Sequence, residues 1–228
     1  MFDLKQYKSL LAELKREGLV PSLNWNEETN ANTLFLRHDI DFSIEFAHKL
    51  ASLEFNLGIY STYFLMLTSN MYNLISLKNQ RLAKEIAEMG HKISIHFDPT
   101  VYSELSKFEY EKHLFENIFN VEVDIVSIHR PGPFLENNNV FLCGIPQTYN
   151  DTFFKAMKYI SDSGGRDVRP QIIEYLSGPR SQGLHLLIHP IWWVGQGSNV
   201  SETLNFWRKK QFDFVTSEIR LNVKSYMD

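Results

Sequence analysis

Up to Pro131, the spacing of apolar residues predicts helices that alternate with strands. Helices are expected where apolar residues recur every three or four positions, in the ranges 1–19, 42–58, 80–89 and 103–119. Runs of β-branched and aromatic residues predict strands at 34–41, 59–67, 91–97 and 124–129. Because helices of crossover length separate these strands, we expect them to be parallel.

Beyond Pro131 the pattern weakens, and Gly- and Pro-rich loops join three short strand candidates at 157–160, 171–175 and 184–189. The C-terminal segment is again helical in pattern. A closed α/β barrel and a doubly wound sheet both fit this order. In either architecture the functional face lies at the carboxyl ends of the strands. We expect residues 1–228 to form one domain.

Composition narrows the range of partners. The hydrophobic content of 43% can supply a sizeable core. The net charge of -4 gives no electrostatic sign of binding to nucleic acid or to an anionic bilayer. The lone Cys143 cannot form an internal disulfide. The charged N-terminus lacks the apolar core of a signal peptide, and no stretch approaches the roughly 18 apolar residues of a membrane span. These features predict a cytoplasmic protein without a nucleic-acid partner or integral membrane segment, and they leave the oligomeric state open.

Unusual polar residues gather at the carboxyl ends of the predicted strands. Alternation in an extended strand places Asp39 and Asp41 on one face, where two carboxylates need a positive partner. Three imidazoles also end strands, those of His96, His129 and His189. A mixed set of Asp and His suits a divalent transition metal such as zinc, held by three protein ligands with one position open to water.

Five motifs in order, RHDID, GHKISIHFD, SIHRPG, SDSGGR and LLIHP, span roughly residues 34–195. This set resembles the polysaccharide deacetylases of the NodB-homology superfamily, which are similar to carbohydrate esterase family 4, and in particular a divergent branch from surface-polysaccharide biosynthesis clusters. The resemblance implies an α/β fold, a NodB-like distorted (β/α) barrel with about seven parallel strands. It also implies a divalent metal cofactor, zinc.

Residue roles follow from the resemblance position by position. Asp39 matches the family's catalytic base and Asp41 a metal ligand, although the family pair is adjacent and here Ile40 intervenes, so the roles could be exchanged or both carboxylates could approach the metal. His96 matches the first of two metal-binding histidines. The second falls on Thr100, a poor zinc ligand. The third ligand is then expected elsewhere, with His129 as first choice and Asp98 as second.

Supporting roles follow from the later motifs. Arg130 matches the arginine that orients the base, and Asp162 the acidic residue that anchors this arginine. His189 matches the general acid that protonates the leaving amine. Trp192 could belong to the core or offer a flat surface to a sugar ring, and Arg166 could bind an anionic substrate group. Two other histidines are read from alternation alone: His38 should pack in the core, and His185 could lie in the core or support the site.

The expected function is metal-dependent removal of an N-acyl group, acetyl or formyl, from an amino sugar in a surface glycan or a nucleotide- or lipid-linked precursor. The partner is thus an amino-sugar-containing small molecule or glycan. One alternative is a catalytically inactive barrel that binds a sugar or glycan intermediate, suggested by Thr100. Another keeps the metal but cleaves a different bond, such as an ester.

Overall fold

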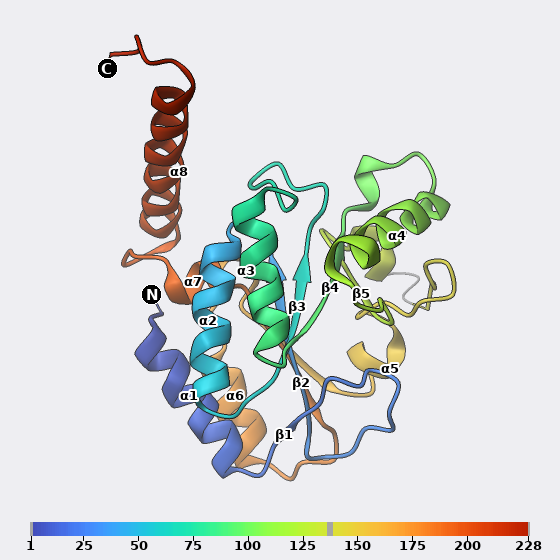
Figure 1. Ribbon diagram of the computed structural model, residues 1–228. Helices are drawn as coiled ribbons and strands as arrows, with labels where there is room; N and C mark the ends of the chain where they lie inside the picture. The colour runs from blue at the N-terminus through green and yellow to red at the C-terminus, as the bar shows by residue number, and fades with distance from the viewer. Residues whose placement is uncertain (1, 136–138, 228) are drawn as a thin grey trace.

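A seven-stranded parallel sheet flanked by helices forms the centre of the molecule (Figure 1). The computed structural model describes residues 2–135 and 139–227. The strands are β1 Val20–Pro21, β2 Thr33–Ile40, β3 Thr62–Leu65, β4 Lys92–Phe97, β5 Val126–Ile128, β6 Lys158–Ser161 and β7 Leu184–Ile188. Their order is β5-β4-β3-β2-β7-β6, with β1 paired to the start of β2. The predicted α/β fold with about seven parallel strands is confirmed.

Strand β2 carries two different faces. All eight of its residues are buried. Leu36 and Ile40 face the helices that cover the outside of the sheet, and His38 lies on the same side, bonded to Glu54 of a covering helix. Phe35, Arg37 and Asp39 alternate with these residues and face the interior. The alternation read from the sequence is therefore correct along this strand, and it sends its charged residues inward.

The first four long helices lie close to their expected places. They are α1 Leu4–Arg16, α2 Ile44–Asn56, α3 Leu77–Glu88 and α4 Phe108–Phe119. Side-chain caps fix three of their starts, at Asp3, Ser43 and Ser76. Helix α4 begins later than the predicted Ser103, because residues 105–107 form a separate 3-10 turn. Helices α1, α2 and α3 lie on one side of the sheet (Figure 1).

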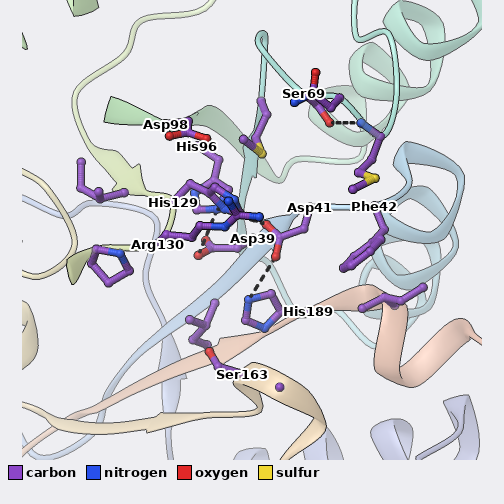
Figure 2. Close-up of a pocket in the computed structure, with 18 of the residues that line it drawn as sticks. Asp39, Asp41, Phe42, Ser69, His96, Asp98, His129, Arg130, Ser163 and His189 are labelled. Carbon is purple, nitrogen blue, oxygen red and sulfur yellow. Dashed lines mark hydrogen bonds and ion pairs between the residues drawn. The ribbon is translucent and has the colours of Figure 1, made fainter. Parts of the chain in front are cut away.

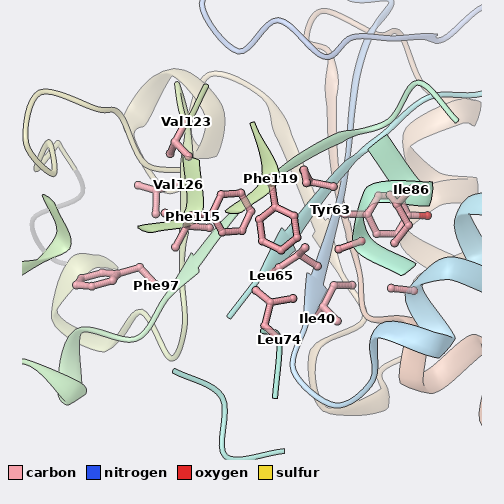
Figure 3. Packing of buried hydrophobic residues seen from close by; sticks show 14 of the residues in the cluster. Ile40, Tyr63, Leu65, Leu74, Ile86, Phe97, Phe115, Phe119, Val123 and Val126 are labelled. Atoms are coloured by element: carbon pink, nitrogen blue, oxygen red, sulfur yellow. The ribbon is translucent and has the colours of Figure 1, made fainter. Parts of the chain in front are cut away.

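A large apolar cluster joins α2, α3 and α4 to strands β3, β4 and β5 (Figure 3). Tyr63, Leu65 and Val126 project from the strands, and Ile86 and Phe115 from the helices, all fully buried. Burying such side chains contributes roughly 1.5–3 kcal/mol each, which holds the strand ends of this half of the sheet in place. The position of His96 in β4 and of His129 just after β5 depends on this packing.

One of the strands predicted in the second half of the chain is wrong. Residues 171–175 were expected as a strand, but they lie inside helix α6 Arg169–Ser177. Pro170 stands in the first turn, where its fixed φ favours a helix, and Ile172 alone is buried, as on a helix with one face on the core. The unpredicted two-residue strand β1 makes up the count of seven. The strands expected at 157–160 and 184–189 are confirmed as β6 and β7.

The sheet is open between β5 and β6, which are not hydrogen-bonded to each other among the described residues. The segment before β6, with helix α5 Asp151–Phe154, lies beside this opening, and Gln147 forms a bridge with Val126 of β5. Inside the curve, Trp25 stacks on Phe35 at 4.2 Å between ring centroids and packs against Phe153. These rings pack together in the interior of the curve.

The chain ends in α7 Pro190–Val194 and the long helix α8 Val200–Asn222, which projects from the rest of the molecule (Figure 1). Most residues of α8 beyond its first turns are exposed. Within residues 2–135 and 139–227, none of the helices combines the length and the apolar character that crossing a membrane would require.

Candidate metal centre

A pocket of about 400 Å³ opens at the carboxyl ends of the strands (Figure 2). Its polar wall comes from segments far apart in sequence: the end of β2, the end of β4, the turn after β5 and the end of β7. The polar residues expected at strand ends line it together: Asp39, Asp41, His96, Asp98, His129, Arg130 and His189. The predicted convergence of these groups at one mouth of the fold is confirmed.

Three of these side chains form a compact group that could hold a metal ion. The ligand atoms of Asp41, His96 and His129 all lie within 4.8 Å of one another. His96 Nε2 lies 3.1 Å from Asp41 Oδ1 and 3.1 Å from His129 Nδ1, while His129 Nδ1 lies 3.6 Å from Asp41 Oδ1. These are the three residues expected as ligands, and Asp98, the other candidate for the third ligand, is not in this group.

The donor set fits a divalent cation. Asp41 Oδ1 is buried and has no hydrogen-bond partner among the described residues, although two imidazole nitrogens face it. Burial opposes ionisation of Asp41, but the adjacent His129 and His96 outweigh it and hold the pKa of this carboxyl well below its usual range. Converging carboxylate and imidazole atoms are zinc-type ligands. A buried carboxylate oxygen without a donor is the kind of atom that a metal ion would satisfy.

Asp39 is held by a guanidinium on its own strand. Arg37 donates from Nε to Oδ1 at 2.8 Å and from Nη2 to Oδ2 at 2.6 Å, a two-pronged ion pair in which both side chains are buried. Burial alone would raise the pKa of Asp39, but Arg37 and then His96 lower it to about 2. Asp39 is therefore ionised at neutral pH. The arginine expected in this role, Arg130, is replaced by Arg37, because strand alternation places residue 37 beside residue 39.

Arg130 and Asp98 lie at the rim of the pocket in other roles. Arg130 follows β5 with a left-handed backbone, at φ 50°, and its side chain lines the pocket. Asp98 accepts hydrogen bonds from the amide of Thr100 at 2.9 Å and from its hydroxyl at 2.6 Å, which starts a short 3-10 turn. Thr100 thus binds Asp98, and Asp98 lies outside the three-residue group.

Asp162 is hydrogen-bonded to His189 and not to Arg130, the partner expected from the sequence. It accepts from His189 Nδ1 at 2.6 Å, from the His189 amide and from Trp193 Nε1 at 2.8 Å. Burial opposes the charged form of His189, but Asp162 outweighs this effect and raises the pKa of the imidazole to about 9. The ring is therefore protonated near neutral pH. Its Nε2 lies 3.8 Å from Asp41 Oδ2, on the side of the pocket.

Of the two residues expected to contact substrate, Trp192 lines the pocket and Arg166 does not. Trp192 is only 5% exposed but lines the pocket, and its Nε1 is buried without a hydrogen-bond partner among the described residues. Arg166 is exposed and does not line the pocket. Its Nε donates to the carbonyl of Ser163, which does line it together with Gly164. The position of Arg166 gives no support to its expected contact with an anionic substrate group.

Sequence reasoning missed Arg37, Ser127 and Tyr149 as members of the site. Ser127 Oγ contacts Arg37, Asp39 and His96, and the ring of Tyr149 lies 4.8 Å from the Arg37 guanidinium. Two of these residues carried a signal: Arg37 is two positions before Asp39, and Ser127 two before His129, so each shares a face with a candidate residue. Tyr149 lies in an irregular segment, where no strand alternation relates it to a candidate residue.

The remaining buried histidines belong to the core. His38 Nε2 lies 2.8 Å from Glu54 Oε1, behind β2, as its alternation predicts. His91 is bonded to the Ser61 amide and the Ala51 carbonyl. His185 binds the Phe153 carbonyl at 2.9 Å and packs edge-on to Trp25, so this position is structural.

Comparisons with known proteins give structural matches alone. No family model matches the sequence, and no curated protein matches it. Similar solved structures include the catalytic domain of a peptidoglycan N-acetylglucosamine deacetylase from Eubacterium rectale, at 14% identity over 87% of this chain and 90% of that one, with a TM-score of 0.49. A chitin deacetylase from Colletotrichum lindemuthianum is 14% identical over 84% of this chain and 86% of that one, with a TM-score of 0.48.

A family 4 carbohydrate esterase pseudoenzyme from Bacillus anthracis is also similar, at 14% identity and a TM-score of 0.44. The match covers 85% of this chain and 64% of that one, so this chain spans less than two thirds of its length. Catalysis and substrate are not fixed by likeness at this level.

Proposed function

We propose that this protein is a metal-dependent hydrolase that removes an N-acyl group, acetyl or formyl, from an amino sugar in a surface glycan or in a nucleotide- or lipid-linked precursor. The observation that carries the proposal is the convergence of Asp41, His96 and His129 in a pocket that also contains a paired Asp39 and a paired His189. A metal group alone could be structural. The flanking base and acid candidates favour catalysis.

Asp41, His96 and His129 would hold a divalent ion, with zinc as the best match to this donor set. When bound, such an ion polarises a carbonyl oxygen and makes water acidic enough to react near neutral pH. Asp39 stands outside this group, with both oxygens toward Arg37. This arrangement favours Asp41 as the ligand and Asp39 as the base over the exchanged assignment.

Asp39 and His189 have opposite proton occupancies at neutral pH, which amide hydrolysis requires. Asp39 has a pKa of about 2, so it is ionised at neutral pH and would accept the proton of the attacking water. His189 has a pKa of about 9 and carries the proton that the departing nitrogen needs. An amine is a poor leaving group unless it is protonated. Groups whose surroundings move their pKa values apart are the usual acid and base of one site.

The pocket wall also suits a sugar. Phe42, Met66, Ile191 and Trp192 provide apolar surface beside the polar groups of the pocket. Trp192 is therefore the residue that we assign to substrate contact.

Metal content tests the proposal most directly. Wild-type protein purified with zinc should bind one equivalent, whereas Asp41→Ala, His96→Ala and His129→Ala should each lose it. His48→Ala is the matched control, because His48 lies on α2, paired with Glu85 and away from the pocket. The ligand assignment is wrong if Asp41→Ala and His96→Ala both retain the metal.

An amine-release assay separates the proposed enzyme from an inactive sugar-binding barrel. Acetylated and formylated amino sugars, free and linked to a nucleotide or a lipid carrier, should be compared with an acetyl ester. Release of amine from at least one N-acyl sugar, abolished in Asp39→Asn, is expected. A zinc-loaded protein that binds these sugars and releases no amine would support the alternative.

A further inference from the structure

Ser127 of β5 connects the candidate base to the candidate metal group. Its Oγ lies 2.6 Å from Arg37 Nη2, 3.0 Å from Asp39 Oδ1 and 2.8 Å from His96 Nδ1. Ser127, Arg37 and His96 are all buried, with exposures of 0%, 0% and 2%. With so little access to water, these hydrogen bonds have few substitutes.

The protons of this cluster can be assigned by counting donors. A serine hydroxyl has one proton and two lone pairs. A guanidinium can only donate, so Arg37 occupies one lone pair of Ser127 Oγ. Asp39 is ionised by its two-pronged pair with Arg37, so it receives the serine proton.

One lone pair of Ser127 Oγ then remains, and it faces His96 Nδ1. Two acceptors cannot share a hydrogen bond, so His96 Nδ1 must carry a proton. In the neutral ring, Nε2 is then bare. This bare nitrogen is the atom that faces Asp41 Oδ1 and His129 Nδ1, each at 3.1 Å.

We propose that Ser127 is a positioning residue which fixes the tautomer of His96, so that Nε2 presents its lone pair to the metal, and that Arg37 fixes the orientation of the Ser127 hydroxyl. One arginine thereby orients two neighbours of the reaction: it holds the Asp39 carboxylate directly and the His96 ring through Ser127. The inference rests on the proposed function for its catalytic meaning. The hydrogen bonds of Ser127 with Arg37, Asp39 and His96 are present without metal or substrate.

The tautomer is measurable in the metal-free protein. Long-range proton–nitrogen NMR spectra of the imidazole rings, recorded where His96 carries a single ring proton, should show that proton on Nδ1 and a bare Nε2. Ser127→Ala removes the acceptor and should shift the ring toward the other tautomer or a mixture. A wild-type spectrum with the proton on Nε2 would overturn the proposal, whatever the fate of the variant.

Zinc affinity provides the second readout, measured by competition with a chelator. Ser127→Ala should weaken zinc binding by roughly 10–100-fold, as is usual when a partner of a ligating histidine is removed. Ser127→Thr, which keeps the hydroxyl, should restore most of the loss. Ser94→Ala is the matched control, because Ser94 is a fully buried serine of β4 whose hydroxyl bonds the Ile125 carbonyl. It should leave zinc affinity unchanged.

Two outcomes separate this inference from the proposed function. A protein that shows the expected tautomer but binds no zinc would end the proposed function and leave the role of Ser127 intact. If the wild type and Ser127→Ala bind zinc equally well and have the same His96 tautomer, this inference is wrong and the metal site is unaffected.

Discussion

Two buried clusters of carboxylate and imidazole lie on opposite faces of β2, and they differ in how completely their hydrogen bonds are satisfied. Behind the strand, Glu54 of α2 accepts from the hydroxyls of Tyr7, Ser61 and Tyr63 and pairs with His38. In front, Asp41 Oδ1 has no hydrogen-bond donor among the described residues, and imidazole nitrogens of His96 and His129 face it at 3.1 and 3.6 Å.

The contrast shows how a structural polar cluster can be told from a candidate functional one. Burial opposes the charge of Glu54, but His38 and further hydrogen-bond donors outweigh it and lower the pKa, so this carboxylate needs no further ligand. No pocket residue contributes to its set of donors. The front cluster opens on a 400 Å³ pocket and contains a buried carboxylate oxygen that has no hydrogen-bond donor among the described residues. The two clusters contain the same residue types. They differ in whether the buried carboxylate oxygens have hydrogen-bond donors among the described residues.

Removal of the candidate acid should have the largest effect on activity. His189→Gln loses the protonated imidazole beside the pocket, so the rate of amine release should fall by about 10²–10⁴-fold while bound zinc is retained. Steady-state rates and metal analysis check this. His185→Gln on the same face of β7 is the control, because its ring binds the Phe153 carbonyl in the core. Equal losses in the two variants would contradict the assignment.

Removal of Glu54 should instead act on stability. Glu54→Ala leaves three hydroxyls and His38 without their acceptor, so the free energy of unfolding should fall by about 3–5 kcal/mol. Zinc affinity per folded molecule should stay unchanged, since the cluster lies behind the sheet. Urea unfolding and zinc titration of the folded fraction provide the two measurements. A selective loss of zinc binding would show that the two faces are coupled.

A third buried carboxylate tests the same rule with a smaller effect. Glu111 of α4 accepts from Tyr102 at 3.0 Å, and its Oε1 has no hydrogen-bond partner among the described residues. Burial raises its pKa to about 7, more than the Tyr102 bond lowers it. The folded state therefore binds its proton more tightly than the unfolded state does, and the stability it contributes at low pH is lost as pH rises toward about 7.

Glu111→Gln cannot ionise and should be more stable than wild type above this range, by roughly 1–3 kcal/mol. The advantage should shrink toward about pH 5, where the wild-type carboxyl is protonated in the fold. Urea unfolding at about pH 5 and about pH 8 measures both values. A variant that is less stable at the higher pH would show that Glu111 is ionised and paired in the folded state.

Local patterns predicted the elements wherever one face of a strand or helix is buried. Alternation along β2 correctly separated His38 from Asp39, because a period of two leaves no choice of side once Leu36 and Ile40 face the core. The same reasoning failed at 171–175, where a short apolar run suits both a strand and a helix and Pro170 decides for the helix.

The sequence by itself determined which residue types end the strands, and hence that acids and imidazoles would meet at one mouth of a parallel sheet. Partner choice within that mouth was decided only by the tertiary structure. Asp162 binds His189 and not Arg130, because a hydrogen bond depends on differences of a few tenths of an ångström between segments that are far apart in the chain. Spacing along the sequence has no information at that scale.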